Sequence, residues 1–431
     1  MTAIKHELAL FHPGVKEKSV NSTSWINYRP VSQISNSSAI EFNVSGTTSD
    51  YILLSKTRLY LQARIVKASN GAVVDDTNDV SFVNLSMHSM FRQVDILLNQ
   101  KLVTSGVGVN YPYKAMIDVL LNYDHGVKDS LLQSEGYHKD AAFSFDNNSN
   151  PGHTGRKNWT KHGIVDFEGP LHCDVAQQEK AILNGVQITV KLFQHDDTFR
   201  LFHPSGDVET YRIEIMDAVL KVCNIKVNPS VTVAQNEVLT KTPAVYPHWR
   251  SDIKTFSVAK GSFTFSVDDI FHGVVPARLF VALVSSSAYA GDTSKSPFNF
   301  WHFHLSYLEL AVDGNSVPTV AFQPKYQDNT ASAGEVVPNG FVHEFVSAFS
   351  SKYPQAEGNW IKREEFPGGY CIYVFDVKAG IDDNLFSQLQ SGHTRLNARF
   401  DKELPEPVTV IAYGIFPSDF KIDQVRNVIL T

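Results

Sequence analysis

The chain has few cysteines for its 431 residues: Cys173, Cys223 and Cys371 lie far apart, and no CxxC spacing occurs. A disulfide framework normally uses an even number of cysteines at short spacings, and a cysteine-rich zinc site uses CxxC pairs. The sequence therefore indicates neither kind of cross-link. We expect reduced thiols that are mostly buried.

Basic runs and long apolar runs are also absent. The formal net charge is −7, the pI is near 6.1, and no run of Lys and Arg exceeds a pair. These values argue against a dense basic surface, so we expect no sequence-specific nucleic-acid partner. The first seven residues lack the apolar core of a secretory signal, and no run approaches the roughly 18 apolar residues of a membrane span. We expect a soluble intracellular protein without a membrane span or a cofactor.

The sequence is rich in residues that favour β-sheet. Hydrophobic residues make up 43% of the chain and aromatic residues 11%, with 28 Phe. Val, Ile, Phe, Tyr and Thr dominate the periodic runs, and Ser, Asn, Gly and Pro cluster between these runs at short intervals, which is typical of an all-β sandwich or barrel. Because one hydrophobic core rarely organises a chain of this length, two domains of about 200 residues each are predicted.

A degenerate internal repeat indicates that the two domains are alike. Residues 94–103 match residues 308–317, and each copy places a polar turn, Asn99-Gln100 or Asp313-Gly314, after an apolar run. Such turns join two antiparallel strands. The other matches follow in the same order: 81–85 with 296–300, the helix-like 113–120 with 341–349, the short polar segments of helical character 174–184 with 381–390, and the strand-like 186–193 with 394–400 and 212–219 with 408–415. Identity is low, so the shared order carries the argument.

The remaining pattern predicts strands at 25–29, 40–44 and 57–66 and two long polar insertions. The first insertion is residues 123–162, with a structureless centre at 145–152, and the second insertion is residues 323–339. Long loops in compact domains are usually functional or mobile. We therefore expect both insertions to project from the same end, and deletion of residues 145–152 to weaken assembly while leaving the fold intact.

The chain resembles a known family over most of its length, most strongly between residues 80 and 125. The resemblance rests on the pattern NxxxxSMFxxVDxxxN at residues 84–99, YPYKA at 111–115 and LL at 120–121. This pattern is similar to that of the hexon, or major capsid protein, of Polinton/Maverick elements and adintoviruses, whose genes several invertebrate genomes carry in integrated elements. The resemblance implies two tandem eight-stranded antiparallel jelly rolls, a double jelly roll with a few short helices. It also implies that three copies form a pseudo-hexameric capsomer of an icosahedral shell.

Under this interpretation the chain divides into an N-terminal arm (1–22), a first jelly roll (23–228), a connector (229–246) and a second jelly roll (247–431). The expected partners are other copies of the chain, as a homotrimer and then a capsid lattice, together with penton and minor capsid proteins. The expected location is the capsid of a virion. No catalytic residue is needed for any of these roles.

Candidate contact residues come from a basic-aromatic cluster in the first insertion and from a charged run in the second half. Both are predicted to touch neighbouring subunits, although a small basic-aromatic cluster also suits nucleic acid or a glycan. The candidates are Arg156, Lys157, Trp159, Lys161, Lys362 and Arg363.

An alternative function is a two-domain jelly-roll metalloenzyme or a carbohydrate-binding protein. His302 and His304 are the candidate metal ligands, because residues two apart share one face of a strand and imidazole pairs bind copper or zinc. No third ligand is indicated by spacing, and the flanking Trp301 and Leu305 suit a core strand. The prediction is therefore that no metal is bound, with these two histidines as the weak candidates.

Overall fold

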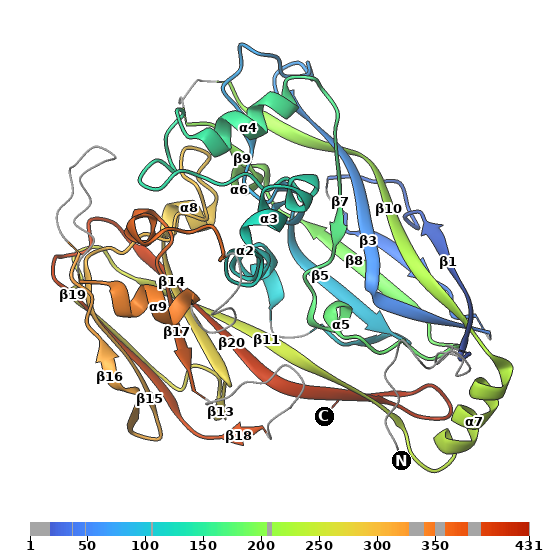
Figure 1. Ribbon diagram of the computed structural model, residues 1–431. Helices are drawn as coiled ribbons and strands as arrows, with labels where there is room; N and C mark the ends of the chain where they lie inside the picture. The colour runs from blue at the N-terminus through green and yellow to red at the C-terminus, as the bar shows by residue number, and fades with distance from the viewer. Residues whose placement is uncertain are drawn as a thin grey trace, which may run out of the picture.

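The computed structural model describes residues 18–36, 38–47, 49–104, 107–204, 209–326, 340–349, 358–377 and 389–430. Two β-structures lie side by side, the first half of the chain in blue to green and the second half in yellow to red (Figure 1). Several helices lie between them (Figure 1). The predicted arm up to residue 17, most of the second insertion and most of the segment 381–390 lie outside the described residues.

The first half contains two four-stranded sheets with strand orders β1-β10-β3-β7 and β2-β8-β5-β6, and a small β4-β9 pair. Neighbouring strands in all three are antiparallel. The strands are β1 (Val20–Tyr28), β2 (Ile40–Val44), β3 (Asp50–Lys67), β4 (Ser81–Phe82), β5 (Phe91–Leu98), β6 (Lys101–Leu102), β7 (Val165–Pro170), β8 (Ile188–Gln194), β9 (Leu201–Phe202) and β10 (Tyr211–Val227).

The second half repeats this plan with orders β11-β20-β14-β17 and β12-β19-β15-β16, with β21 added beside β20 and a small β13-β18 pair. Its strands are β11 (Ala244–Val258), β12 (Thr264–Asp268), β13 (Val274–Val275), β14 (Arg278–Ser285), β15 (Leu305–Val312), β16 (Asn315–Phe322), β17 (Ile372–Asp376), β18 (Gln390–Ser391), β19 (Thr394–Phe400), β20 (Val408–Ile422) and β21 (Val428–Leu430).

The two strand orders correspond one to one, which is the internal repeat in three dimensions. β1, β2, β3, β5, β6, β7, β8 and β10 take the places of β11, β12, β14, β15, β16, β17, β19 and β20. In each half the first strand pairs with the last, and the second pairs with the next to last, as in a jelly roll of two Greek keys. The predicted fold, two eight-stranded antiparallel sandwiches, is confirmed.

The hairpins that revealed the repeat have the predicted turns. In the first hairpin Leu98 pairs with Lys101, and in the second Val312 pairs with Asn315. Both central residues of each two-residue turn have positive φ: 45° and 67° at 99–100, and 49° and 82° at 313–314. Turns of this mirror-image kind match the twist of the paired strands and favour Asn, Asp and Gly. The polar residues that mark the repeat in the sequence therefore form the turns of the two hairpins.

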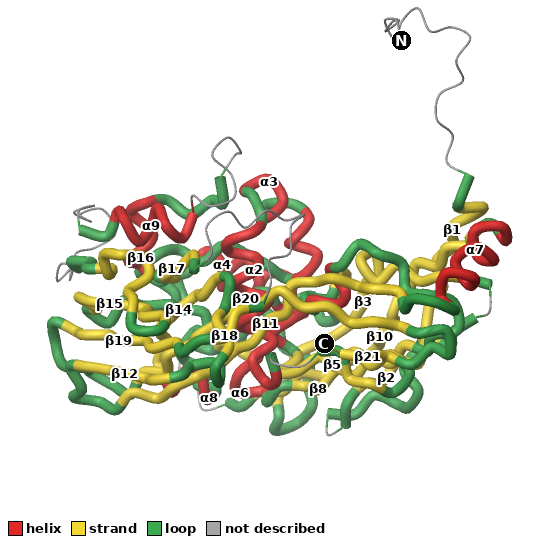
Figure 2. The backbone as a smooth tube through the Cα atoms, turned by 90° about the horizontal axis from the view of Figure 1, so that it is seen from below, coloured by secondary structure: helices red, strands yellow, loops and turns green. Residues whose placement is uncertain are grey.

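Short helices fill the connections between strands. They are α1 (Ser86–Ser89), α2 (Tyr111–Asn122), α3 (His125–Lys128), α4 (Pro151–Thr160), α5 (Asp174–Gln177), α6 (Asp197–Arg200), α7 (Pro229–Leu239), α8 (Ser286–Ala290) and α9 (Val342–Phe349), with 3-10 turns η2 (Gly108–Asn110), η3 (Leu131–Glu135) and η4 (Arg363–Gly368). The predicted helices 113–120 and 341–349 are confirmed as α2 and α9. Figure 2 shows α3 and α9 on the same side of the molecule.

Two hydrophobic cores interlock at the centre of the molecule. Helix α2 of the first half contributes Ala115, Ile117 and Leu120 to the core of the second half. In return, β20 of the second half contributes Phe420 and Ile422 to the core of the first. The second exchange occurs because β11 and β20 run past the junction toward α7 (Figure 1). The two jelly rolls therefore bury apolar surface against each other.

The first insertion differs from the prediction because it is folded. It contains α3, η3 and α4, and Phe145 at its predicted structureless centre is buried. Asn150 caps α4 by accepting the N–H of Gly152 at 3.0 Å, and Pro151 occupies the first helical position, which are favourable choices at a helix start. Deletion of residues 145–152 would remove this cap and a core ring, so this deletion should destabilise the fold, contrary to the expectation from the sequence.

Candidate assembly surfaces and a buried polar network

Arg156 lies inside the molecule rather than at its surface. Only 3% of the residue is exposed. Its guanidinium pairs with Asp140 at 3.1 Å and donates a hydrogen bond to the carbonyl of Phe82 at 3.0 Å. Asn84 and Asn150 donate to the same carboxylate at 2.8 and 2.9 Å. Arg156 is therefore removed from the candidate contact residues, because its charge is used to hold the first insertion on the first jelly roll.

The neighbours of Arg156 on α4 are more accessible. Lys157 pairs with Asp79 at 3.2 Å, and Lys161 pairs with Asp76 at 3.3 Å, in both cases with about a quarter of the lysine side chain exposed. Trp159 is half-buried and packs its ring against His138, with ring centroids 4.2 Å apart. Exposed ion pairs of this kind contribute little to folding stability, so these side chains remain available for other contacts.

The second candidate pair lies at the start of η4. Lys362 is exposed, Arg363 is half-buried, and the backbone N–H of Lys362 donates to Glu365 at 2.7 Å. Glu365 also pairs with Lys139 of the first insertion at 2.7 Å. The first insertion and η4 are thus neighbours, although they come from different jelly rolls.

Several further contacts join the first insertion to the second jelly roll. Tyr370 donates its hydroxyl to the carbonyl of Asp140 at 2.6 Å, and the N–H of Phe143 donates to the carbonyl of Gly368 at 2.7 Å. Lys128, which is buried, donates to the carbonyl of Asn359 at 2.6 Å. The insertion therefore acts first as a bridge within one chain.

The two histidines proposed from spacing do not lie on a strand. His302 and His304 precede β15, in a turn where residues 303 and 304 have φ of 44° and 53°. The His302 ring is buried and stacks on Tyr326 at 4.2 Å, and its Nδ1 accepts the N–H of His304 at 2.9 Å. The argument from strand alternation is therefore wrong for this pair.

A buried polar network lies where α2 meets the second jelly roll. Lys114 on α2 pairs with Asp118 at 2.7 Å and with Asp174 at 3.3 Å, and Tyr413 of β20 donates to Asp118 at 3.1 Å. Burial alone would raise the pKa of Asp118, but the Lys114 ammonium, with a smaller effect from His172, outweighs burial and holds that pKa at about 2. Asp118 is therefore a carboxylate at neutral pH, although its side chain is only 8% exposed.

The same network continues to His88, Glu135 and His172. His88 Nε2 lies 2.9 Å from Glu135, and His88 Nδ1 lies 2.8 Å from the Tyr111 hydroxyl. A glycine permits this approach: Gly136 follows Glu135 at φ 84°, and a Cβ there would lie 2.6 Å from the Cβ of Ser86 on α1. Any larger residue at position 136 would therefore push η3 away from α1.

Sequence reasoning did not select the members of this network. One signal was present, because Lys114 and Asp118 are charged residues four positions apart within an otherwise apolar helical pattern. The other members come from segments far apart in the sequence, and no spacing connects them.

Comparisons with known proteins agree with this architecture. No protein-family model matches the chain. An uncharacterized protein of Caenorhabditis elegans is 23% identical over 401 residues, which cover 90% of this chain and 92% of that protein.

Solved structures match over the whole length. A chain of the Sputnik virophage has a TM-score of 0.64 at 10% identity and covers 100% of this chain and 92% of its own. The mavirus major capsid protein has 0.53 at 13%, with 100% and 95% covered, and the Faustovirus major capsid protein has 0.57 at 9%, with 99% and 93% covered. The chain has the double jelly roll fold of these capsid proteins.

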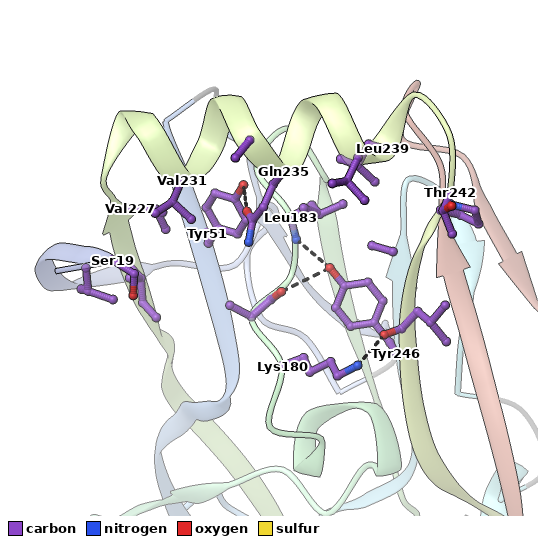
Figure 3. Close-up of a pocket in the computed structure, with 18 of the residues that line it drawn as sticks. Ser19, Tyr51, Lys180, Leu183, Val227, Val231, Gln235, Leu239, Thr242 and Tyr246 are labelled. Atoms are coloured by element: carbon purple, nitrogen blue, oxygen red, sulfur yellow. Dashed lines mark hydrogen bonds between the residues drawn. The ribbon is translucent and has the colours of Figure 1, made fainter. Parts of the chain in front are cut away.

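One end of the double jelly roll is hollowed beneath α7. The pocket has a volume of about 840 Å³, and the apolar side chains of Val231 and Leu239 on α7 line it together with Leu183 (Figure 3). On the opposite side, the Tyr246 hydroxyl donates to Ala181 at 3.2 Å and accepts the N–H of Leu183 at 3.2 Å. Ser19, next to the first described residue, also lines the pocket.

The structure also describes the environment of the three cysteines and the length of the helices. Cys173, Cys223 and Cys371 are buried free thiols, as predicted. Of the helices in the described ranges, none is long and apolar enough to cross a membrane.

Proposed function

We propose that this chain is a structural major capsid protein, or hexon, that forms homotrimeric pseudo-hexameric capsomers of an icosahedral shell. The observation that carries the proposal is the match of both jelly rolls, over 100% of this chain, to the mavirus major capsid protein. The Faustovirus major capsid protein supports it in the same way, with 99% of this chain covered.

The duplication gives a physical reason for this assembly. Each chain presents two sandwiches with the same strand order, so a ring of three chains presents six similar sides. Closed symmetry then lets one set of contacts complete the ring without leaving open edges. Rigid sheets with folded connections supply the walls of such a capsomer, and no catalytic group is required.

We propose the Polinton/Maverick and adintovirus lineage for this copy. The sequence pattern at residues 84–121 supports this assignment, and the nematode relative supports a gene carried in an animal genome. The proposed location is a virion capsid, with penton and minor capsid proteins as further partners.

The accessible candidate residues form the proposed contacts between subunits. They are Lys157, Trp159 and Lys161 on α4, and Lys362 and Arg363 at η4. Trp159 supplies a half-buried aromatic surface next to cationic groups, a combination that is common at protein interfaces.

The test is the native mass in solution, measured by light scattering, with imaging of the same fraction. We expect a mass three times the 48.0 kDa of one chain and a six-sided outline. A chain that stays monomeric at high concentration would overturn the proposal. The alternative, a jelly-roll enzyme or carbohydrate-binding protein, predicts such a monomer. Its metal-site argument from the sequence required His302 and His304 to share one face of a strand, and the two residues lie in a turn instead.

A further inference from the structure

Three buried side chains in the first jelly roll converge on one point. His88 lies on α1, Glu135 ends η3, and His172 follows β7. Their exposed fractions are 1%, 2% and 1%, and one ligand atom from each lies within 4.8 Å of the other two. In the part of the chain that the structure describes, this is the one group of three or more His, Cys, Asp or Glu side chains with such geometry.

The two imidazoles are oriented alike. Nε2 of His88 lies 2.9 Å, and Nε2 of His172 lies 3.7 Å, from the same oxygen, Oε2 of Glu135. Their opposite nitrogens face other polar groups: Nδ1 of His88 lies 2.8 Å from the Tyr111 hydroxyl, and Nδ1 of His172 lies 3.8 Å from Asp118. In metal sites one histidine nitrogen binds the ion and the other is held by a hydroxyl, carbonyl or carboxylate, and the Tyr111 hydroxyl is placed for this role beside His88.

His172 gives an independent indication of a ligand. Neither of its ring nitrogens makes a hydrogen bond, although the residue is 1% exposed. The carboxylate oxygens at 3.7 and 3.8 Å are beyond hydrogen-bond length. A buried polar group without a partner is costly, so such groups are normally satisfied by protein, water or an ion. Here one nitrogen points at the other two candidate ligands.

The charges around the cluster favour a cation. Glu135, Asp118 and Asp174 place three carboxylates in or beside the cluster, and Lys114 supplies the one ammonium that pairs with them in the described network. A divalent ion beside Glu135 would offset this excess of carboxylates. Buried carboxylates are normally paired or bound to a metal, because an uncompensated buried charge is expensive.

We propose that His88, His172 and Glu135 bind one divalent first-row transition-metal ion, with Zn²⁺ as the expected occupant. Two imidazoles and one carboxylate suit Zn²⁺, whereas Mg²⁺ and Ca²⁺ prefer oxygen ligands alone. The role is structural, because the ion ties α1 and the segment after β7 to η3 of the first insertion. This inference goes beyond the proposed capsid function and does not depend on it.

The first experiment is metal analysis of the full-length chain, prepared without an affinity tag or chelator and dialysed against metal-free buffer. We expect Zn²⁺ near one ion per chain in the wild type and almost none in His172→Gln. His302→Gln, which changes a buried histidine elsewhere, is the matched control and should keep its metal. Stoichiometric metal in His172→Gln would overturn the proposal, because the ion would then lie at another site.

A second experiment does not require the His172 variant to fold. Wild-type protein treated with a chelator should gain thermal stability when Zn²⁺ is added, and X-ray absorption should then show two imidazoles in the first coordination shell.

Tyr111→Phe, which removes the hydroxyl facing His88, should weaken Zn²⁺ binding about 10- to 100-fold in competition with a chelating dye. Wild type that binds neither Zn²⁺ nor Co²⁺ would overturn the proposal and leave His172 as a cation between Glu135 and Asp118. These readouts are the same for monomer and trimer, so a failure here is distinct from a failure to assemble.

Discussion

The two jelly rolls share one strand order but stabilise equivalent connections with opposite chemistry. Between β6 and β7, the first jelly roll buries the Arg156–Asp140 pair together with Asn150, and Asn84 from the β4–β5 connection donates to the same carboxylate. Between β16 and β17, the second packs aromatic rings. Phe366 lies at their centre, with ring centroids 5.9 to 6.3 Å from those of its neighbours, which are Phe341, Phe345, Phe349 and Tyr373.

The two kinds of contact differ in how strictly they depend on the relative orientation of the contacting groups. A charged hydrogen bond requires its partner at one distance and angle, so the first connection has a defined geometry that fails if one member is lost. Apolar packing has no such requirement, and neighbouring rings can shift to fill part of a gap. The connection that bridges both jelly rolls is the polar one, which suits a segment whose position must be fixed.

The largest expected effect comes from breaking the polar connection. Arg156→Met should lower the free energy of unfolding by about 3 to 5 kcal/mol, because it leaves the buried Asp140 carboxylate without its cation. Urea unfolding monitored by fluorescence measures the change. Lys157→Met, one residue along α4, is the control and should cost no more than about 1 kcal/mol, since its ion pair is partly exposed. Equal losses in both variants would contradict the account.

The aromatic connection should lose somewhat less. Phe366→Ala removes a fully buried ring and should lower the free energy of unfolding by about 3 kcal/mol, the lower end of the range for such a change, because the surrounding rings can close on the space. Phe263→Ala is the matched control. Its side chain is 53% exposed, so its unfolding midpoint in urea should stay close to that of the wild type. A larger loss in Phe366→Ala than in Arg156→Met would reverse the comparison.

Sequence reasoning recovered what local signals specify. The hairpin turns at 99–100 and 313–314 and the helix α2 follow from turn chemistry and periodicity within a few residues. The sequence of the first insertion predicts a loop because its polar residues are indistinguishable, in sequence, from solvated ones. Asp140 and Arg156 become core residues only through partners that the fold supplies, and Asp118 meets Tyr413 across 295 positions.

The bridge between the jelly rolls should respond to pH through Lys128. Burial, with a smaller effect from Lys139, lowers the pKa of Lys128 from 10.5 to about 7 in the folded chain. Between these two values the unfolded chain holds the proton more tightly, so stability should rise with pH above 7, by at most about 1.4 kcal/mol per pH unit from this group. Unfolding of the wild type and of Lys128→Met at pH 7, 8 and 9 measures the difference.

The variant separates this effect from general alkaline changes. Lys128→Met cannot titrate, so the wild type should gain stability relative to it as the pH rises. Lys362→Met, which changes an exposed lysine, should instead run parallel to the wild type. A constant difference between the wild type and Lys128→Met over this range would show that the buried amine keeps its ordinary pKa.

The smallest effect on folding is expected at the accessible candidate contacts, one in each jelly roll. Lys161→Gln and Lys362→Gln remove surface charges and should leave the unfolding midpoint unchanged. If both clusters are contacts in a trimer, each change should lower the trimer fraction measured by light scattering at low protein concentration. In a ring of three chains the two jelly rolls would alternate. A contact residue on one jelly roll would then face the other kind of jelly roll in the neighbouring chain. A trimer weakened by only one of the two variants would therefore assign the contact to that jelly roll and show that the repeat in structure is not a repeat in function.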